Sequence, residues 1–419
     1  MLKIQSMAEI IPFRGLLYNV TKVSVEEVLA PPYDIITPEW QESLYNKSPY
    51  NIVRVDFAKE ESGDNETENK YTRAKRCLDA WIKKGVLVRS RKPSFYAYEI
   101  IYSFHDIKRR FIGFLCLVKL EDLEKGSIYP HECTHAKPKQ DRLNLLKACE
   151  ANTSPIFSLY KSPANEISGI LSRTTLTKPY LQAADISGNL HRLWQIDRVK
   201  EIETIQQELS DKVIFIADGH HRYETSLEFR RERAKGKPSL SDRNPWDYTL
   251  MFLTNMADEG ITILPTHRFI NQIPEDIHER LSRYFEIETV ADNLDIRRKL
   301  SSRKNALGFF RRPAKTWYIL TYKGRDLSEI PPDLREIDVI ILHEVIFNKI
   351  LPNAEIGYEM DIPTALDRVN RGEHAAAFFL NPTRVEDVER SALSSRRLPP
   401  KSTYFYPKLL TGLVLNKWK

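Results

Sequence analysis

Residues 213–227, "VIFIADGHHRYETSL", join a short apolar run to a segment that carries two histidines and an arginine. The run VIFIA predicts a buried strand, and Asp218–Gly219 predicts a turn after it. The residues that follow predict a helix from about His221 to Lys235. Strands that alternate with helices are typical of mixed α/β or α+β proteins. We therefore expect such a fold, with polar side chains collected at the end of this strand.

The predicted turn places its polar groups where open α/β sheets bind ligands. The first backbone N–H groups of a helix attract anions, and His220, His221 and Arg222 would add further donors around one. Asp218 could orient a histidine, bind a metal ion or accept a proton. The structural alternative is that Asp218 only caps the helix and the histidines only pack. Two histidines and an arginine in one helical turn favour the ligand site.

The composition is that of a soluble globular protein, with 42% hydrophobic and 29% charged residues in a chain of 419. The net charge of +6 is modest, and the basic run at 230–238 lacks interleaved aromatic residues, so we expect no nucleic-acid partner. His343 and Glu344 interrupt the apolar run "DVIILHEVIF", so we expect no membrane span. The first residues lack the layout of a secretory signal, which predicts a cytoplasmic protein.

Pattern changes along the chain suggest three regions with soft boundaries that could share one core. Residues 1–165 form an N-terminal α/β region that carries the PPYD and HECTH segments. Residues 166–300 form a central region with DGHHRYE and THR, and residues 301–419 form a C-terminal α/β region. Apolar spacings also predict a helix within 66–84 and two strands at 95–104 and 110–122.

The segment "HECTH", residues 131–135, matches the HExxH pattern of zinc proteases. That pattern works only on a helix, where the two histidines lie one turn apart. Pro130 and Pro138 flank the segment, which therefore predicts a loop rather than such a helix. We favour a structural loop or a site loop over a zinc site, with Glu132 as its candidate functional residue.

Other short segments carry polar side chains that have ordinary explanations when each is taken singly. Turn chemistry or surface polarity accounts for each of PPYD with Asp34, NIVR with Asn51 and Arg54, Asp141–Arg142, THR at 266–268, and PPKSTYFYPK at 399–408. The chain has no glycine-rich loop of the Walker type.

Several of these segments together resemble a known family. The chain is similar, over residues 31–414, to the family called domain of unknown function ten-fifteen. The stretches that carry the resemblance are "PPYDII", "NIVR", "YPHECTHAKPKQDRLNLLKACEANTSPIF", "ADGHHRYETSL", "LPTHR", "AFFLNPT" and "PPKSTYFYPKLLTGLV". The family typically keeps the first His, the Glu and the Thr of HECTH, but His135 is not a fixture, which weakens the zinc interpretation further.

A second, local resemblance concerns the strand–DGHHR–helix unit alone. It looks like the unit of the ParB and sulfiredoxin-like superfamily, in which the corresponding turn binds nucleotide phosphates. One branch comprises free-serine kinases with a similar Asp-Gly-His-His-Arg signature. The resemblance implies that Gly219, His220, His221 and Arg222 contact phosphates.

The expected function is therefore a nucleotide-dependent phosphotransferase that acts on a small hydroxyl metabolite, with serine as the first one to test. ATP or ADP would be the nucleotide, and Asp218 would hold Mg²⁺ or position the hydroxyl. Glu132 would be the base, His221 would assist, and Arg142 and Arg268 would be further phosphate clamps. The alternatives are a nucleotide-binding switch or adaptor without transfer, and a phosphatase or other hydrolase that uses the same anion site.

Overall fold

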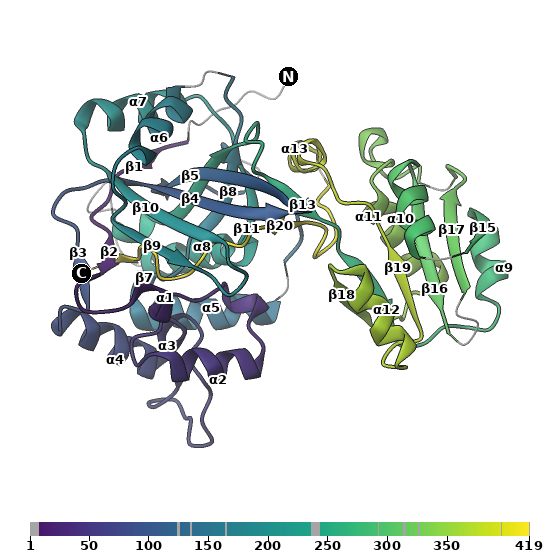
Figure 1. Ribbon diagram of the computed structural model, residues 1–419, viewed down its shortest axis with the longest axis horizontal. Helices are drawn as coiled ribbons and strands as arrows, with labels where there is room; N and C mark the ends of the chain where they lie inside the picture. Colours follow the sequence, from purple (N-terminus) through teal and green to yellow (C-terminus); the bar gives the residue numbers. More distant parts are fainter. Residues whose placement is uncertain are drawn as a thin grey trace. The chain divides into compact units, whose positions relative to one another are not determined.

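Figure 1 shows the computed structural model of the chain. The structure describes residues 8–123, 126–134, 136–163, 166–235, 244–291, 293–312, 316–325, 327–394 and 396–418. The described residues form two compact units. The first contains the residues up to Pro130, then 134–261 and 407–419, and the second contains 131–133 and 262–406. Both combine helices with sheets, which confirms the mixed α/β class. The boundaries of the three sequence regions stay a prediction.

The first unit contains a large mixed sheet and eight α-helices within its described residues. Its strands are β1 (Ile10–Ile11), β2 (Leu16–Tyr18), β3 (Leu87–Arg89), β4 (Phe95–Phe104), β5 (Ile107–Lys119), β6 (Ile128–Pro130), β7 (Ala151–Asn152), β8 (Ile156–Tyr160), β9 (Leu181–Ala184), β10 (Leu190–Ile196), β11 (Ile214–Asp218), β12 (Tyr248–Asn255) and β21 (Asn416–Lys417). Its helices are α1 (Val25–Val28), α2 (Pro38–Lys47), α3 (Val53–Asp56), α4 (Lys70–Lys83), α5 (Ala136–Cys149), α6 (Glu166–Thr175), α7 (Val199–Leu209) and α8 (His220–Ala234), with 3₁₀ turns η1 (Tyr33–Ile35) and η2 (Pro245–Asp247).

The large sheet has the order β6-β11-β8-β12-β5-β4-β10-β9, with β1 beside β5. Strand β11 runs parallel to β6 and antiparallel to β8, so it lies inside the sheet. The four residues before Asp218 are all buried, so both faces of this strand are covered, which explains the unbroken apolar run. Ile214 and Ile216 join a core cluster that also receives Ile170 of α6, Ile205 of α7 and Leu227 of α8.

The predicted local elements of the first unit are confirmed. Thr37 accepts a hydrogen bond from the Trp40 N–H and thereby caps α2, whose first residue is Pro38. Helix α4 lies within the predicted range and is followed by Gly85 in the left-handed region, at φ 65°. The predicted strand pair corresponds to β4 and β5, which are joined by a turn through His105 and Asp106.

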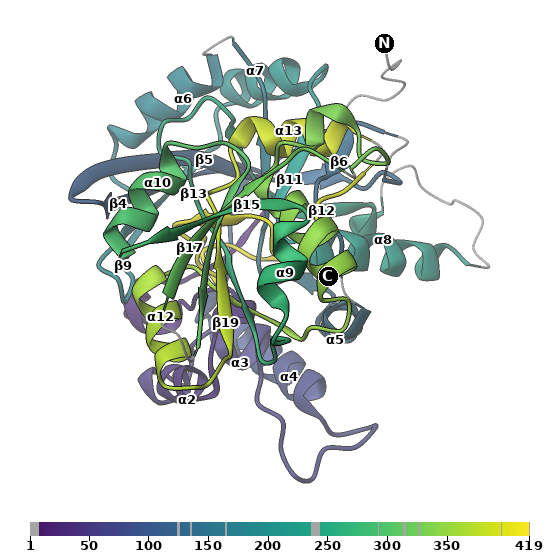
Figure 2. The same ribbon diagram turned by 90° about the vertical axis from the view of Figure 1, so that its right-hand side faces the viewer.

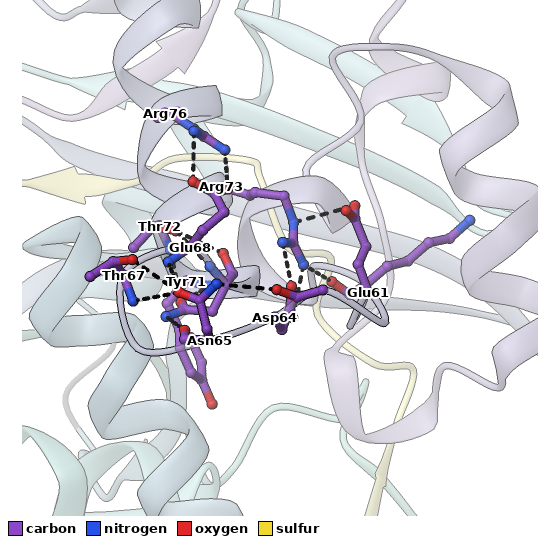
Figure 3. A network of polar contacts seen from close by, with 12 residues as sticks. Glu61, Asp64, Asn65, Thr67, Glu68, Tyr71, Thr72, Arg73 and Arg76 are labelled. Carbon is purple, nitrogen blue, oxygen red and sulfur yellow. Dashed lines mark hydrogen bonds and ion pairs between the residues drawn. The ribbon is translucent and has the colours of Figure 1, made fainter.

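The loop between α3 and α4 is held by a network of polar contacts (Figure 3). Oδ1 of Asn65 accepts hydrogen bonds from the N–H groups of Thr67 and Glu68, at 3.0 Å each. Arg73 forms an ion pair with Asp64. These contacts fix the chain just before α4, whose first turn carries Lys70 and Tyr71. Both of these side chains contact a residue of the candidate site below.

The second unit contains a six-stranded antiparallel sheet with the order β15-β17-β16-β19-β14-β18. Its strands are β13 (Thr262–Leu264), β14 (His267–Ile270), β15 (Phe285–Val290), β16 (Ala306–Arg311), β17 (Thr316–Tyr322), β18 (Ile356–Glu359), β19 (Ala376–Phe379) and β20 (Tyr404–Tyr406). Its helices are α9 (Ile277–Ser282), α10 (Asn293–Ser301), α11 (Asp338–Ile341), α12 (Ile362–Asn370) and α13 (Val385–Leu393), with a 3₁₀ turn η3 (Pro332–Leu334) and a π-helix η4 (Leu342–Ile350).

Helices cover both faces of this second sheet. Alternate residues of β16 belong to two different clusters: Phe309 packs with α9 and the π-helix, whereas Phe310 packs with α10 and α12. Figure 2 shows α10 and α12 on one side of this sheet and α9 on the other. The apolar stretch that His343 interrupts thus forms α11 and the buried π-helix. Across the described ranges, no helix is both long and apolar enough to cross a membrane.

Candidate anion-binding site

The turn between β11 and α8 has a geometry that only glycine adopts readily. Gly219 lies in the left-handed region, at φ 94° and ψ 27°, and it is the N-cap residue of α8. It offers no side chain to cap the helix, so the first N–H groups of α8 receive no hydrogen bond acceptor from it. A bulge in the pairing of β11 with β8 lies between Ile216 and Asp218 and redirects the end of the strand.

Arg222 folds back over this turn. A Cβ atom on Gly219 would lie only 2.9 Å from Nε of Arg222 and 3.1 Å from its Cζ, so the guanidinium group rests on the glycine. The same group donates a hydrogen bond to the carbonyl oxygen of Pro155. Helix α8 therefore begins with a fixed positive charge in addition to its own partial positive charge.

Asp218 lies between two cations. Its Oδ2 accepts a hydrogen bond from Nζ of Lys408 at 2.6 Å, and its Oδ1 lies 3.7 Å from Nη2 of Arg222. All three side chains are largely buried, with 24% of Asp218, 15% of Arg222 and 13% of Lys408 exposed. His220 and His221 occupy the first turn of α8, where His220 is buried and His221 is half-buried. Two cations, one carboxylate and a helix N-terminus can together bind an anion such as a phosphate.

Arg142 belongs to the same unit and is held rigidly. Its Nε and Nη2 donate hydrogen bonds to Asp141, at 2.9 and 2.5 Å, and its Nη1 donates to the carbonyl oxygen of Asp56 at 2.8 Å. Asp141 is itself bound by Lys70, at 2.7 Å, and by the hydroxyl of Tyr71, at 3.0 Å. Burial raises the pKa of Asp141, but the charge of Arg142 and the hydrogen bond from Lys70 outweigh it and lower the pKa to about 2.

Tyr33 and Asp56 extend this cluster, although sequence reasoning did not select them. The guanidinium carbon of Arg142 lies 4.0 Å from the centre of the Tyr33 ring. Burial raises the pKa of Tyr33 to about 12, against the charges of Arg142 and Arg222, so its hydroxyl stays protonated. Asp56 accepts a hydrogen bond from Thr153 at 2.6 Å.

Several of the short segments therefore gather in the first unit. PPYD contributes Tyr33, NIVRVD contributes Asp56, and the Asp141–Arg142 pair, ADGHHR and YPK contribute the rest. Except for Asp56, these residues lie in stretches that carry the family resemblance. Taken one by one, only ADGHHR stood out from ordinary turns in the sequence.

Two predicted site residues, Glu132 and Arg268, lie in the second unit. The carboxylate of Glu132 accepts hydrogen bonds from the backbone N–H groups of Lys401, at 2.6 Å, and Ser402, at 3.3 Å. Arg268 donates to the carbonyl oxygens of Thr266 and Lys401, and burial lowers its pKa to about 10. The structure thus places these two residues in one cluster around residues 401–402, whereas Asp218, Arg222 and Arg142 share the first unit. The roles predicted for all of them stay predictions.

The donor set does not suit a metal ion at Asp218. Both oxygens of its carboxylate already face a cation, Lys408 on one side and Arg222 on the other, which a divalent cation would have to displace. Among the described residues there is also no group of three or more His, Cys, Asp or Glu side chains that could hold a metal ion. Residues 131–134 are not helical, so the part of HECTH that the structure describes lacks the geometry of the zinc motif, and His135 lies outside the described residues.

Comparisons with known proteins place the chain in a family. Residues 10–340 match the family described as "Protein of unknown function (DUF1015)". No protein of curated function matches the sequence. The solved structures with similarity include a conserved hypothetical protein from Pyrococcus furiosus, with 13% identity over 68% of this chain and 92% of that chain, at a TM-score of 0.37.

A free serine kinase in complex with AMP is similar at 13% identity over 68% of this chain and 89% of that chain, with a TM-score of 0.37. SbnI with a C-terminal truncation, from Staphylococcus aureus, is similar at 11% identity over 71% of this chain and 85% of that chain, with a TM-score of 0.36. Similarity at this level assigns no activity to the chain.

Proposed function

The chain belongs to this family of unknown function, and we propose that it is a nucleotide-dependent phosphotransferase that acts on a small hydroxyl metabolite. The observation that carries the proposal is the arrangement of Asp218 between Lys408 and Arg222 at the N-terminus of α8. It combines an anion site with a carboxylate that can act on a substrate hydroxyl, and phosphoryl transfer depends mainly on such positioning and charge neutralisation.

In this proposal the first N–H groups of α8, together with His220, His221 and Arg222, bind the phosphates of ATP or ADP. Asp218 accepts the proton of the substrate hydroxyl while the oxygen of that hydroxyl attacks the terminal phosphorus atom of the nucleotide. The bond from that phosphorus to the bridging oxygen breaks, and the electron pair leaves with the shortened nucleotide. Arg222 and Lys408 stabilise the charge that develops on the leaving phosphate. Magnesium would arrive with the nucleotide, and no protein ligand for it is assigned.

Asp218 takes precedence over Glu132 as the proton acceptor in this scheme. Glu132 has its carboxylate bound by two backbone N–H groups of its own unit, whereas Asp218 directly precedes the N-cap residue of α8, the helix whose first turn binds the phosphates in this proposal. Arg142 and Arg268 remain candidates for further phosphate contacts. Serine is the first alcohol to test, because the DGHHR resemblance points to free-serine kinases.

The test is a coupled phosphotransfer assay with ATP or ADP and a panel of small alcohols. Asp218→Asn keeps the size of the side chain but removes the base, so we expect it to lower kcat by about 100-fold or more. Asp211→Asn, at an exposed acid of the same unit, is the matched control and should leave turnover unchanged. Turnover of Glu132→Gln, compared with that of Asp218→Asn, shows which of the two candidate bases the reaction needs. Unchanged turnover in Asp218→Asn would contradict the proposal.

A nucleotide-binding switch is the second candidate, and one observation favours it. Lys408 and Arg222 engage the carboxylate of Asp218, so proton transfer requires at least one of these ion pairs to open. Nucleotide binding in a calorimeter, without product from any alcohol, would identify the switch. Release of inorganic phosphate from phosphoserine in the absence of nucleotide would instead indicate a phosphatase that uses the same site.

A further inference from the structure

A small polar cavity lies in the first unit, between α5, α8 and the segment that joins β7 to β8. Its volume is about 40 Å³, room for about three water molecules. The lining residues are Arg142, Leu145, Leu146, Ala151, Asn152, Thr153, Ser154, Ile156, Arg222, Thr225, Ser226 and Thr249. The cavity therefore shares Arg222 with the turn that begins α8.

The lining carries positive charge and hydrogen bond donors. It includes two guanidinium groups, five hydroxyl groups and one side-chain amide, and none of these lining residues is an aspartate or a glutamate. The carboxylates that compensate these two cations lie outside the lining: Asp141 and Asp56 for Arg142, and Asp218 for Arg222. The lining itself offers guanidinium and hydroxyl donors and no carboxylate, which favours a ligand that accepts hydrogen bonds, such as a carboxylate.

Arg142 has donors to spare. Of the five N–H donors of a guanidinium group, Arg142 uses three in its bonds to Asp141 and to the Asp56 carbonyl, which leaves two. The bonds to Asp141 and the stacking on Tyr33 fix the plane of the group, so these donors are already oriented when a ligand arrives.

Arg222 and Ser154 complete the donor set. Arg222 donates to the Pro155 carbonyl through Nη1, whereas its Nε makes no hydrogen bond to another residue in the part of the chain that the structure describes. The hydroxyl of Ser154 likewise makes none to the described residues, although Ser154 is only 8% exposed. Two further lining residues, Ser226 and Thr249, share a hydrogen bond of 3.2 Å.

We propose that this cavity binds the carboxylate group of the substrate, so that the hydroxyl metabolite is a small hydroxy acid or amino acid rather than a neutral alcohol. The inference rests on the proposed function, since it names the substrate class of the same site. A carboxylate has three heavy atoms, which match the room for about three waters, and it pairs with guanidinium through two parallel hydrogen bonds. Because Arg222 touches both the cavity and Asp218, a carboxylate held here leaves the rest of a small molecule beside the reacting turn.

The experiment measures binding by titration calorimetry, independently of turnover. Its probes are L-serine, glycine, serinol and inorganic phosphate. Glycine keeps the carboxylate but has no hydroxyl to phosphorylate, whereas serinol keeps hydroxyl and amine but has no carboxylate. We expect serine and glycine to bind with one site per chain, glycine to compete with serine, and serinol to bind at least about tenfold more weakly than serine.

The variant Ser154→Val removes a donor and fills part of the cavity. It should weaken serine and glycine about tenfold while nucleotide affinity stays within about twofold. Ser187→Val, an exposed site of the same unit, should change neither. If Ser154→Val fails to fold, Thr249→Val gives the same comparison, since it removes a lining hydroxyl at nearly constant volume.

The outcomes separate this inference from the proposed function. If the protein transfers no phosphoryl group but binds glycine and serine, and Ser154→Val weakens that binding, the carboxylate pocket is supported and the kinase proposal is contradicted. If serinol binds as tightly as serine, the cavity does not recognise a carboxylate, and the inference is contradicted whatever the rate of phosphotransfer. Displacement of serine by inorganic phosphate at lower concentration than by glycine would also overturn it, because the cavity would then be a phosphate site.

Discussion

The ammonium group of Lys408 lies 2.6 Å from Oδ2 of Asp218, across 190 positions of the sequence. This ion pair brings the C-terminal segment of the chain back to the first unit, next to the turn that begins α8. It joins a residue proposed to act on the substrate to one proposed to stabilise the leaving phosphate. Its strength should be measurable without any knowledge of the ligand.

A double-mutant cycle on Asp218→Asn and Lys408→Met should show strong coupling. Each single variant leaves the other group without this partner in a largely buried place, so each should lower the free energy of unfolding by about 1–3 kcal/mol. The double variant should lose less than the sum, with a coupling of about 1 kcal/mol or more. Denaturant unfolding of the four proteins gives these values, and simple additivity would show that the pair is not formed in solution.

Replacing Gly219 by alanine should disturb the site by two routes. The left-handed backbone costs an alanine about 1 kcal/mol, and the new Cβ would in addition push the guanidinium group of Arg222 away. Gly188→Ala is the matched control, because Gly188 has φ 77° and no atom within 4 Å of the added Cβ. Gly219→Ala should lose at least as much stability as Gly188→Ala, and only Gly219→Ala should lose nucleotide affinity. Equal nucleotide affinity of the two variants would contradict the role given to Arg222.

The support that Asp141 gives to Arg142 should depend on pH. The pKa of Asp141 is about 2 in the folded state and near 3.8 in the unfolded chain, so the stability it contributes is present above about pH 4 and is lost as the pH falls toward 2. The shift corresponds to about 2 kcal/mol. Unfolding free energies of the wild type and Asp141→Asn should differ by about that amount at pH 7 and converge at the acid end. Parallel pH curves would argue against the assigned contacts.

His267 should make the second unit sensitive to acid. Burial, with help from the charge of Arg268, lowers its pKa to about 3, so it is neutral in the folded state and gains a proton on unfolding below about pH 6.5. Its contribution to stability should therefore fall by up to about 1.4 kcal/mol per pH unit between pH 6.5 and 3. His267→Asn can still accept the hydrogen bond from the Leu380 N–H and does not titrate. Its unfolding free energy should fall less between pH 7.5 and 5, and an equal fall would show that His267 does not cause the sensitivity.

The local part of the fold could be predicted from the sequence. The apolar run, the Asp218–Gly219 pair and the polar start of the helix encode β11, the turn and α8 within fewer than twenty-five residues, and propensity and periodicity act over that range. The same holds for Thr37 at the start of α2 and Gly85 after α4. The family resemblance was confirmed over residues 10–340.

The non-local part could not be predicted. Tyr33 and Asp56 reach Arg142 only through tertiary contacts, and Lys408 reaches Asp218 from the far end of the chain. No spacing rule connects such distant segments, because their pairing depends on the order of strands in the sheet. For the same reason, nothing in HECTH showed that Glu132 would lie with residues 401–402 in the second unit.

The most direct test of the central claim is the transfer of one phosphoryl group from nucleotide to L-serine, followed by ³¹P NMR in the wild type and in Asp218→Asn. The account predicts one O-phosphoserine for each nucleotide consumed by the wild type, and a rate at least about 100-fold lower in Asp218→Asn with nucleotide binding retained. Phosphoserine formed at the same rate by both proteins would contradict it.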